Sequence, residues 1–81
     1  MVDRAALVQF GLTVRQLRLK AGLSQETLAL RASIHRTYIG GIERGERNPT
    51  LLMIVRIARA LDVPVAKIFE VQARVGNEFT D

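Results

Sequence analysis

The chain has no cysteine and only one histidine among its 81 residues. Without cysteine it cannot form a disulfide scaffold, use a thiol in catalysis or hold zinc through thiolates. The single histidine, His35, cannot build a histidine metal cluster, so we expect no metal and no other cofactor. No apolar run approaches the roughly 20 residues that a membrane helix needs, and the N-terminus does not resemble a signal peptide. These absences predict a protein of the reducing cytoplasm with no membrane partner.

Groups for catalysis are equally scarce. The sequence has no second histidine, no glycine-rich phosphate loop and no pair of carboxylates that would share a cleft. His35 and Tyr38 are close in sequence, but they point along different faces of a helix and lack an orienting partner. We therefore expect that the protein is not an enzyme.

What the chain has in excess is positive charge. Its length suffices for one small domain, and 48% apolar with 25% charged residues is typical of a folded protein. The net charge is +4, and ten of the twelve basic residues are arginine. Residues 1–69 hold eleven basic and five acidic groups (+6), whereas residues 70–81 hold one basic and three acidic groups (−2). A basic body with a slightly acidic tail indicates a polyanionic partner.

The apolar residues recur at helical spacing and predict an all-α domain. A first helix over about residues 4–21 has one apolar stripe with a leucine beside it: Phe10, Val14, Leu17 and Ala21, then Leu7. Gly22 can end this helix in the left-handed conformation, and Ser24 can cap a second helix over about residues 25–32. After a turn, Gly45 closes a third helix over about residues 36–44. Two short helices joined by such a turn form a helix-turn-helix.

Two further helices complete the domain. Thr50 caps a fourth helix whose apolar residues share one face: Leu51, Ile54, Ile57, Ala58 and Leu61. Asp62 ends it in the left-handed region that aspartate tolerates, and Pro64 starts a short fifth helix. We expect one domain over residues 1–81, with a core over about 8–70 and residues 71–81 as a helix extension or a tail.

The third helix carries two adjacent glycines, although an interior glycine costs about 1 kcal/mol relative to alanine. In projection, its outward face combines small residues with arginines: Arg36, Thr37, Gly40, Gly41 and Arg44. Such a face suits entry into the major groove of DNA, where bare backbone allows close approach. The alternative, that the glycines let another helix pack closely, is weaker because their neighbours are threonine and arginine rather than aliphatic residues.

Glu43 borders the inward face of the third helix, where a carboxylate is costly unless it is paired. Arg18 lies at the flank of the apolar stripe of the first helix and can reach it. We expect a buried Arg18–Glu43 ion pair that locks the first helix to the third. A surface pair of little energetic worth is the alternative.

The segment GLSQETLALRASIHRTYIGGIERGERNPTLLMIVRIARAL resembles the XRE family, the helix-turn-helix domains related to phage repressors and Cro. The likeness covers about residues 8–70, and its matching motifs occur in order, from Gly-Leu-Ser-Gln to Ile-Glu-Arg-Gly and Asn-Pro. Within the family, HRTYIGGIERGERNP looks most like the controller proteins of restriction–modification systems, in which Arg-Thr-Tyr-Ile recurs. The resemblance implies a compact five-helix, lambda-repressor-like fold that binds DNA through its second and third helices.

The resemblance also implies roles for particular positions. Four match base-reading positions, two of which often carry longer polar side chains in the family: Arg36 and Thr37, then Gly40 and Gly41. Others match positions near the sugar–phosphate backbone: Gln25, Tyr38, Arg44, Arg47 and Asn48. Arg18 and Glu43 match the structural ion pair of the family. Because the glycines lack side chains, we expect direct base contacts from the first turn of the third helix alone. DNA shape should supply the rest of the sequence specificity.

Three features depart from the family pattern. His35 stands where serine, threonine or aspartate usually caps the third helix, so we expect a weaker cap or one from another group. Ser33 replaces the customary turn glycine, which requires a relaxed backbone there. The first helix has a second apolar stripe, Val8, Leu12 and Leu19, which is either tolerated on the surface or contacts another chain or the C-terminal tail.

The resemblance and the charge together imply a sequence-specific, dimeric transcription regulator of the nucleoid. One recognition helix makes few base contacts, so two subunits should bind a palindromic operator in double-stranded DNA with half-sites roughly 34 Å apart. We expect the homodimer surface on the fifth helix and its flanks: Val63, Val65, Ile68, Phe69 and Val71. A controller would act on its own promoter and on that of an endonuclease, with RNA polymerase as a further partner. An antitoxin of a toxin–antitoxin pair and a small phage-type repressor are the alternatives.

Overall fold

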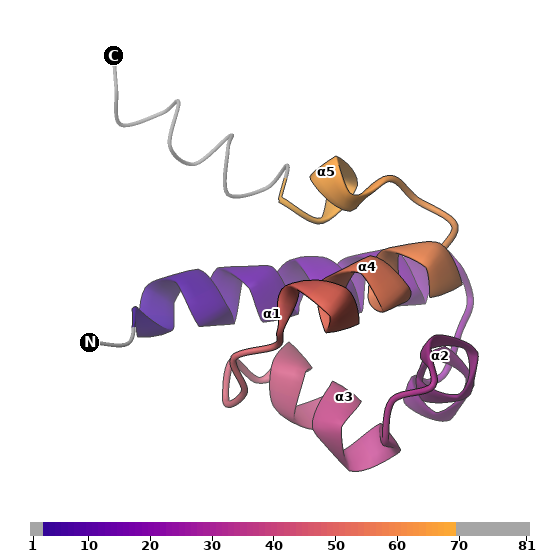
Figure 1. The fold of residues 1–81 in the computed structure, drawn as a ribbon, viewed down its shortest axis with the longest axis horizontal. Helices are drawn as coiled ribbons and strands as arrows, with labels where there is room; N and C mark the ends of the chain where they lie inside the picture. The colour runs from indigo at the N-terminus through magenta and orange to yellow at the C-terminus, as the bar shows by residue number, and fades with distance from the viewer. Residues whose placement is uncertain (1–2, 70–81) are drawn as a thin grey trace.

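A computed structural model describes residues 3–69, and the described chain forms five α-helices. They are α1 (Arg4–Lys20), α2 (Gln25–Ala32), α3 (Arg36–Glu43), α4 (Leu51–Ala60) and α5 (Val65–Ile68). The longest helix, α1, crosses the molecule, with α2 and α3 on one side of it and α5 on the other (Figure 1). Helix α1 packs against α3 and α5, α2 packs against α3 and α4, and α4 packs against α5. The predicted all-α fold with a helix-turn-helix formed by α2 and α3 is confirmed, and none of these helices is long and apolar enough to cross a membrane.

The first four helices begin at side chains that accept a hydrogen bond from an amide of the first turn. The capping residues are Asp3, Ser24, His35 and Thr50. Ser24 and Thr50 act as predicted, each through its hydroxyl and the amide three residues further on. The cap of α3 comes from His35 itself, so of the two expected alternatives, a weaker cap or another capping group, the second is wrong.

The same four helices end at residues with a left-handed backbone. These are Gly22, Ser33, Gly45 and Asp62, with φ of 74°, 56°, 75° and 58°. Each is followed by an amide that bonds back to the last turn, as Ile34 does to the carbonyl of Ala29 at 2.9 Å. Asp62 behaves as predicted, but Ser33 does not sit in a relaxed backbone. A serine in this region is strained, because its Cβ approaches the following carbonyl oxygen.

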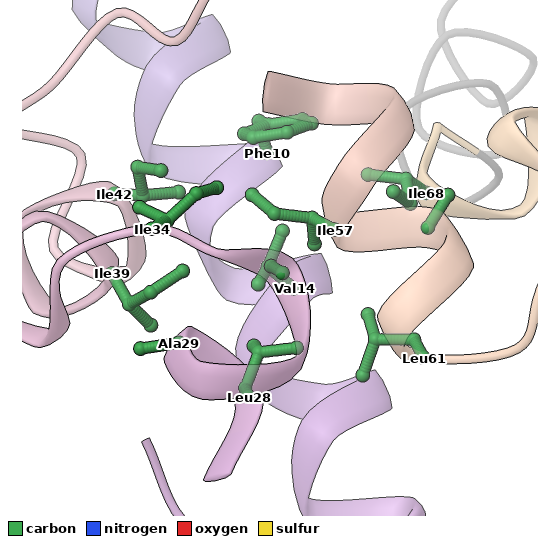
Figure 2. Packing of buried hydrophobic residues seen from close by; sticks show 12 residues of the cluster. Phe10, Val14, Leu28, Ala29, Ile34, Ile39, Ile42, Ile57, Leu61 and Ile68 are labelled. Atoms are coloured by element: carbon green, nitrogen blue, oxygen red, sulfur yellow. The ribbon is translucent and has the colours of Figure 1, made fainter. Parts of the chain in front are cut away.

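Side chains from all five helices and the α2–α3 turn meet in one core (Figure 2). The buried apolar residues are Phe10, Val14, Leu28, Ala29, Ala32, Ile34, Ile39, Ile42, Ile57, Ala58, Leu61 and Ile68. Two residues assigned to this core from the sequence lie outside it. Leu51 is 70% exposed because it is the first residue of α4, and the packed part of that helix begins with Met53 and Ile54. Ala21 is exposed because it caps the end of α1.

Helices α1 and α3 approach each other closely at Gly11 of α1, which the sequence patterns did not indicate. A Cβ atom at this position would lie 2.2 Å from the carbonyl oxygen of Ile42 and 2.8 Å from that of Glu43. Backbone therefore packs on backbone where α1 meets the end of α3. This contact places α3, the recognition helix of the helix-turn-helix, directly against α1, the longest helix of the domain.

Ser33→Gly should stabilise the protein by about 0.5–1 kcal/mol, because glycine removes the left-handed strain but loses more entropy on folding. Thermal or urea unfolding measures the change. Ser24→Gly is the matched control, since Ser24 has φ of −77° and its hydroxyl caps α2. A Ser33→Gly protein no more stable than the parent would contradict the strain at this turn.

Candidate DNA-binding interface

The recognition helix is fastened to α1 by a buried ion pair. Arg18 Nε donates to Glu43 Oε2 at 2.6 Å, and Arg18 Nη2 donates to Glu43 Oε1 at 3.0 Å. The two side chains are only 10% and 3% exposed, so the predicted buried form of the pair is confirmed. Arg18 Nη1 also donates to the carbonyl oxygen of Leu23 at 2.9 Å. The hydrogen bonds to Glu43 raise the pKa of Arg18, against the opposing effect of burial.

Gln25 joins this pair from the start of α2. Its Nε2 donates to Glu43 Oε1 at 3.0 Å, so one carboxylate holds groups from α1 and α2 as well as its own helix. An amide nitrogen carries two hydrogens, and the second remains for a phosphate oxygen. The sequence indicated Gln25 as a phosphate contact, and the structure adds that its amide is oriented by Glu43. That bond joins residues 18 positions apart, and no pattern in the sequence pointed to it.

Arg36 and Thr37 lie at the N-terminal end of α3 and are exposed. Within residues 3–69, neither side chain makes a hydrogen bond or an ion pair. Both are therefore available to a ligand at the end of the helix that enters a groove first. The structure places these two predicted base-reading residues side by side, as the sequence indicated.

Gly40 and Gly41 are buried, which differs from the bare outward face expected from the sequence. A Cβ at Gly40 would lie 3.1 Å from Arg44 Nη1, and a Cβ at Gly41 would lie 2.7 Å from Arg47 Cγ. The protein's own arginine side chains thus cover the glycines. Helical projection could not show this, because Arg47 follows the helix and folds back over it.

The two covering arginines are each held by a neighbour. The guanidinium carbon of Arg47 lies 5.3 Å from the centre of the Tyr38 ring, a cation–π contact. Arg44 Nε lies 3.1 Å from Glu46 Oε2, and both side chains are more than half exposed. The hydrogen bond from Arg44 lowers the pKa of Glu46, so this carboxylate stays charged beside the arginines. Glu46 had not been singled out from the sequence.

Asn48 is exposed and directly follows Arg47 in the chain. It also lines a small, mainly apolar cavity of about 160 Å³ between α1 and α4. The other lining residues are Ala6, Leu7, Phe10, Pro49, Ile54 and Phe69. Within residues 3–69, no hydrogen bond or ion pair joins the Asn48 side chain to the other predicted backbone contacts.

The predicted dimer surface is only partly available on the protomer. Ile68 has no exposed surface, because its side chain lies in the core, and we remove it from that surface. Val63 and Val65 are half-buried against the core, while Phe69 is 38% exposed with its ring 5.6 Å from that of Phe10. Val71 lies outside the described residues.

The second apolar stripe of α1 lies on the surface, as expected. Val8, Leu12 and Leu19 are 39%, 41% and 57% exposed. Val8 also lies against the backbone of Gly45, where a Cβ would come within 2.7 Å of its Cγ2. Part of this stripe therefore covers the turn after α3.

An ordered α2–α3 pair that presents an arginine-covered helix defines a helix-turn-helix DNA-binding domain. The profile of the helix-turn-helix family HTH_3 matches residues 14–68, and the chain belongs to this family. The control protein C.BamHI of Bacillus amyloliquefaciens is 54% identical over 55 residues, which are 67% of this chain and 68% of that protein. C.SmaI of Serratia marcescens is 49% identical over 55 residues, which are 68% of this chain and 66% of that protein.

A solved structure agrees with these relatives. The restriction–modification controller C.AhdI from Aeromonas hydrophila is 49% identical and superposes with a TM-score of 0.80, over 80% of this chain and 98% of that one. The chain is thus a restriction–modification controller protein, a transcriptional regulator and not an enzyme, as the sequence indicated. These matches favour the controller over the antitoxin and the phage repressor.

Arg18→Met should lower the free energy of unfolding by about 3–5 kcal/mol, because it leaves the Glu43 carboxylate buried without its cation. The double variant Arg18→Met/Glu43→Leu should recover most of the loss. Arg15→Met, at an exposed position of the same helix, is the control and should change little. Urea unfolding of the four proteins decides, and a double variant as unstable as the single one would contradict the pairing.

Gly40→Ala and Gly41→Ala should separate helix stability from the placement of the arginines. Gly40→Ala displaces only the tip of Arg44, so it should stabilise the protein by up to about 1 kcal/mol. Gly41→Ala pushes on Arg47 near the base of its side chain, so it should gain less stability and weaken duplex binding more. Unfolding and DNA titration of both variants measure this, and equal effects on binding would contradict it.

Proposed function

We propose that the protein binds a palindromic operator as a dimer and regulates its own gene together with an endonuclease gene. The observation that carries the proposal is the position of α3. Its exposed leading residues, Arg36 and Thr37, are fixed relative to α1 and α2 through Glu43. A helix held in this way can place the same side chains on the same base edges each time it binds.

The side chains of α3 suggest a division of labour. Arg36 suits a bidentate contact with the O6 and N7 acceptors of guanine, and Thr37 suits a thymine methyl group or a nearby acceptor. Arg44 and Arg47, with the second hydrogen of the Gln25 amide, suit phosphate oxygens on either side of the groove. Base contacts would then come from the first turn of α3 and phosphate contacts from its flanks.

The proposed assembly is supported by a relative solved with DNA. The structure of the controller C.Esp1396I is described as a tetramer in complex with its natural 35 base-pair operator. That protein is 35% identical to this chain and superposes with a TM-score of 0.77, over 84% of this chain and 90% of that one. We propose that this chain likewise binds its operator as a multimer built from dimers.

The dimer surface that we propose consists of Val63, Val65 and Phe69, with Val71 beyond the described residues. Two subunits joined there should present their recognition helices to successive major grooves, roughly 34 Å apart. We propose that low occupancy of the operator activates transcription through contact with RNA polymerase, and that higher occupancy represses it. The genes on either side of this one test the biological assignment, because a controller should adjoin a methyltransferase and an endonuclease.

Selection of bound duplexes from a random library, followed by footprinting, tests the function directly. A two-fold symmetric sequence with half-sites about one helical turn apart is the expected result. Uniform coating of DNA without an enriched sequence would overturn the proposal. Analytical ultracentrifugation of the free protein and the complex gives the number of subunits.

Arg36→Ala and Arg47→Ala should weaken DNA binding in different ways. Arg36→Ala should lose about 1–3 kcal/mol on the selected operator and relax the preference at one base position. Arg47→Ala should weaken all sequences alike and reduce the slope of log K against log salt by about one. Titrations at several salt concentrations on matched and scrambled duplexes measure both, and an equal loss of discrimination would contradict the division of labour.

A further inference from the structure

The first turn of α3 depends on an imidazole. His35 Nδ1 accepts a hydrogen bond from the backbone amide of Thr37 at 3.2 Å, and the His35 backbone is extended, with φ of −63° and ψ of 139°. The His35 carbonyl accepts from the amides of Tyr38 and Ile39 at 3.0 and 3.1 Å, so the helix starts at this residue. A ring nitrogen accepts only when it carries no proton, so the cap requires neutral histidine with its hydrogen on Nε2.

We propose that His35 is a positioning residue for operator recognition, which acts by capping the turn that carries Arg36 and Thr37. The inference rests on the proposed function and deepens it, because it names what holds the base-reading residues in place. Those two side chains make no hydrogen bond or ion pair elsewhere in residues 3–69, so their direction follows from the backbone of this turn. Glu43 fixes the other end of the helix, and His35 fixes this one.

The choice of histidine makes this cap different from the other three. The caps of α2 and α4 are hydroxyls, and that of α1 is a carboxylate. Among the helices of residues 3–69, only the recognition helix is therefore capped by a ring nitrogen.

The His35 side chain has no charged partner among the described residues. The charged side chains of the two adjoining helices are Glu26 and Arg31 on α2 and Arg36 and Glu43 on α3. None of them makes a hydrogen bond or an ion pair with His35. Within residues 3–69, the bond from the Thr37 amide is the one hydrogen bond of the ring.

Loss of the cap should lower preference for the operator more than affinity for DNA in general. It loosens the turn that carries Arg36 and Thr37, whereas Arg44 and Arg47, which suit phosphate oxygens, lie beyond that turn. General unfolding would weaken binding to the operator and to unrelated DNA together.

The test compares four proteins: the parent, His35→Asn, His35→Ala and Thr50→Ala. Asparagine is a good cap, alanine is no cap, and Thr50→Ala removes the corresponding cap of α4, away from the recognition helix. Each protein is titrated with the selected operator and with a scrambled duplex under the same conditions. Far-UV circular dichroism confirms that the proteins are folded.

His35→Ala should lose roughly five-fold in operator preference relative to the parent, as expected for the loss of one cap. His35→Asn should keep the parent's preference. Thr50→Ala should follow the parent. At neutral pH, amide hydrogen exchange at Thr37, measured without DNA, should be faster in His35→Ala than in His35→Asn.

Two results would overturn the inference. They are an alanine variant that discriminates like the parent and an asparagine variant that discriminates as poorly as the alanine variant. The second would show that the ring itself contacts the operator. Failure of the proposed function looks different, because no duplex would then be preferred by any of the proteins.

Discussion

The position of the recognition helix depends on one buried carboxylate. Glu43 accepts two hydrogen bonds from Arg18 and one from Gln25, so α1, α2 and α3 meet at a single charged group. Removing such a pair from water is costly, and a well-packed apolar pair is often as stable. The carboxylate instead fixes the relative orientation of α1, α2 and α3, because its hydrogen bonds form in one arrangement of the helices. Backbone contact at Gly11 then sets how closely α1 and α3 approach.

Much of this arrangement could be predicted from residue order alone. Apolar spacing predicted five helices, and the residues expected to cap and end them predicted the bounds of the first four to within about a residue. The Arg18–Glu43 pair followed from a carboxylate that needed a partner. Periodicity identifies the apolar side of a helix but not where its neighbours end, so Leu51 was wrongly assigned to the core. The assignment of Ile68 to a subunit contact failed because apolar residues near a terminus fit a core equally well.

The outer side of α3 shows a second limit of such reasoning. Gly40 and Gly41 looked like bare backbone, yet long side chains from further along the chain lie over them. The free protein therefore presents a layer of guanidinium groups at the place where the helix would approach a duplex. Within residues 3–69, an exposed carboxylate holds Arg44 there and an aromatic face holds Arg47. Contacts of this strength can be exchanged for phosphate oxygens at small cost.

The freedom of Arg36 and Thr37 has a consequence for how such regulators diverge. Their side chains form no hydrogen bond or ion pair within the described part of the chain, so replacing them leaves the core and the Glu43 network unchanged. Surface changes of this kind usually alter stability by less than about 0.5 kcal/mol. A duplicated gene can thus acquire specificity for a new operator sequence without passing through unstable variants. Two such regulators in one cell can then bind different operators without cross-binding.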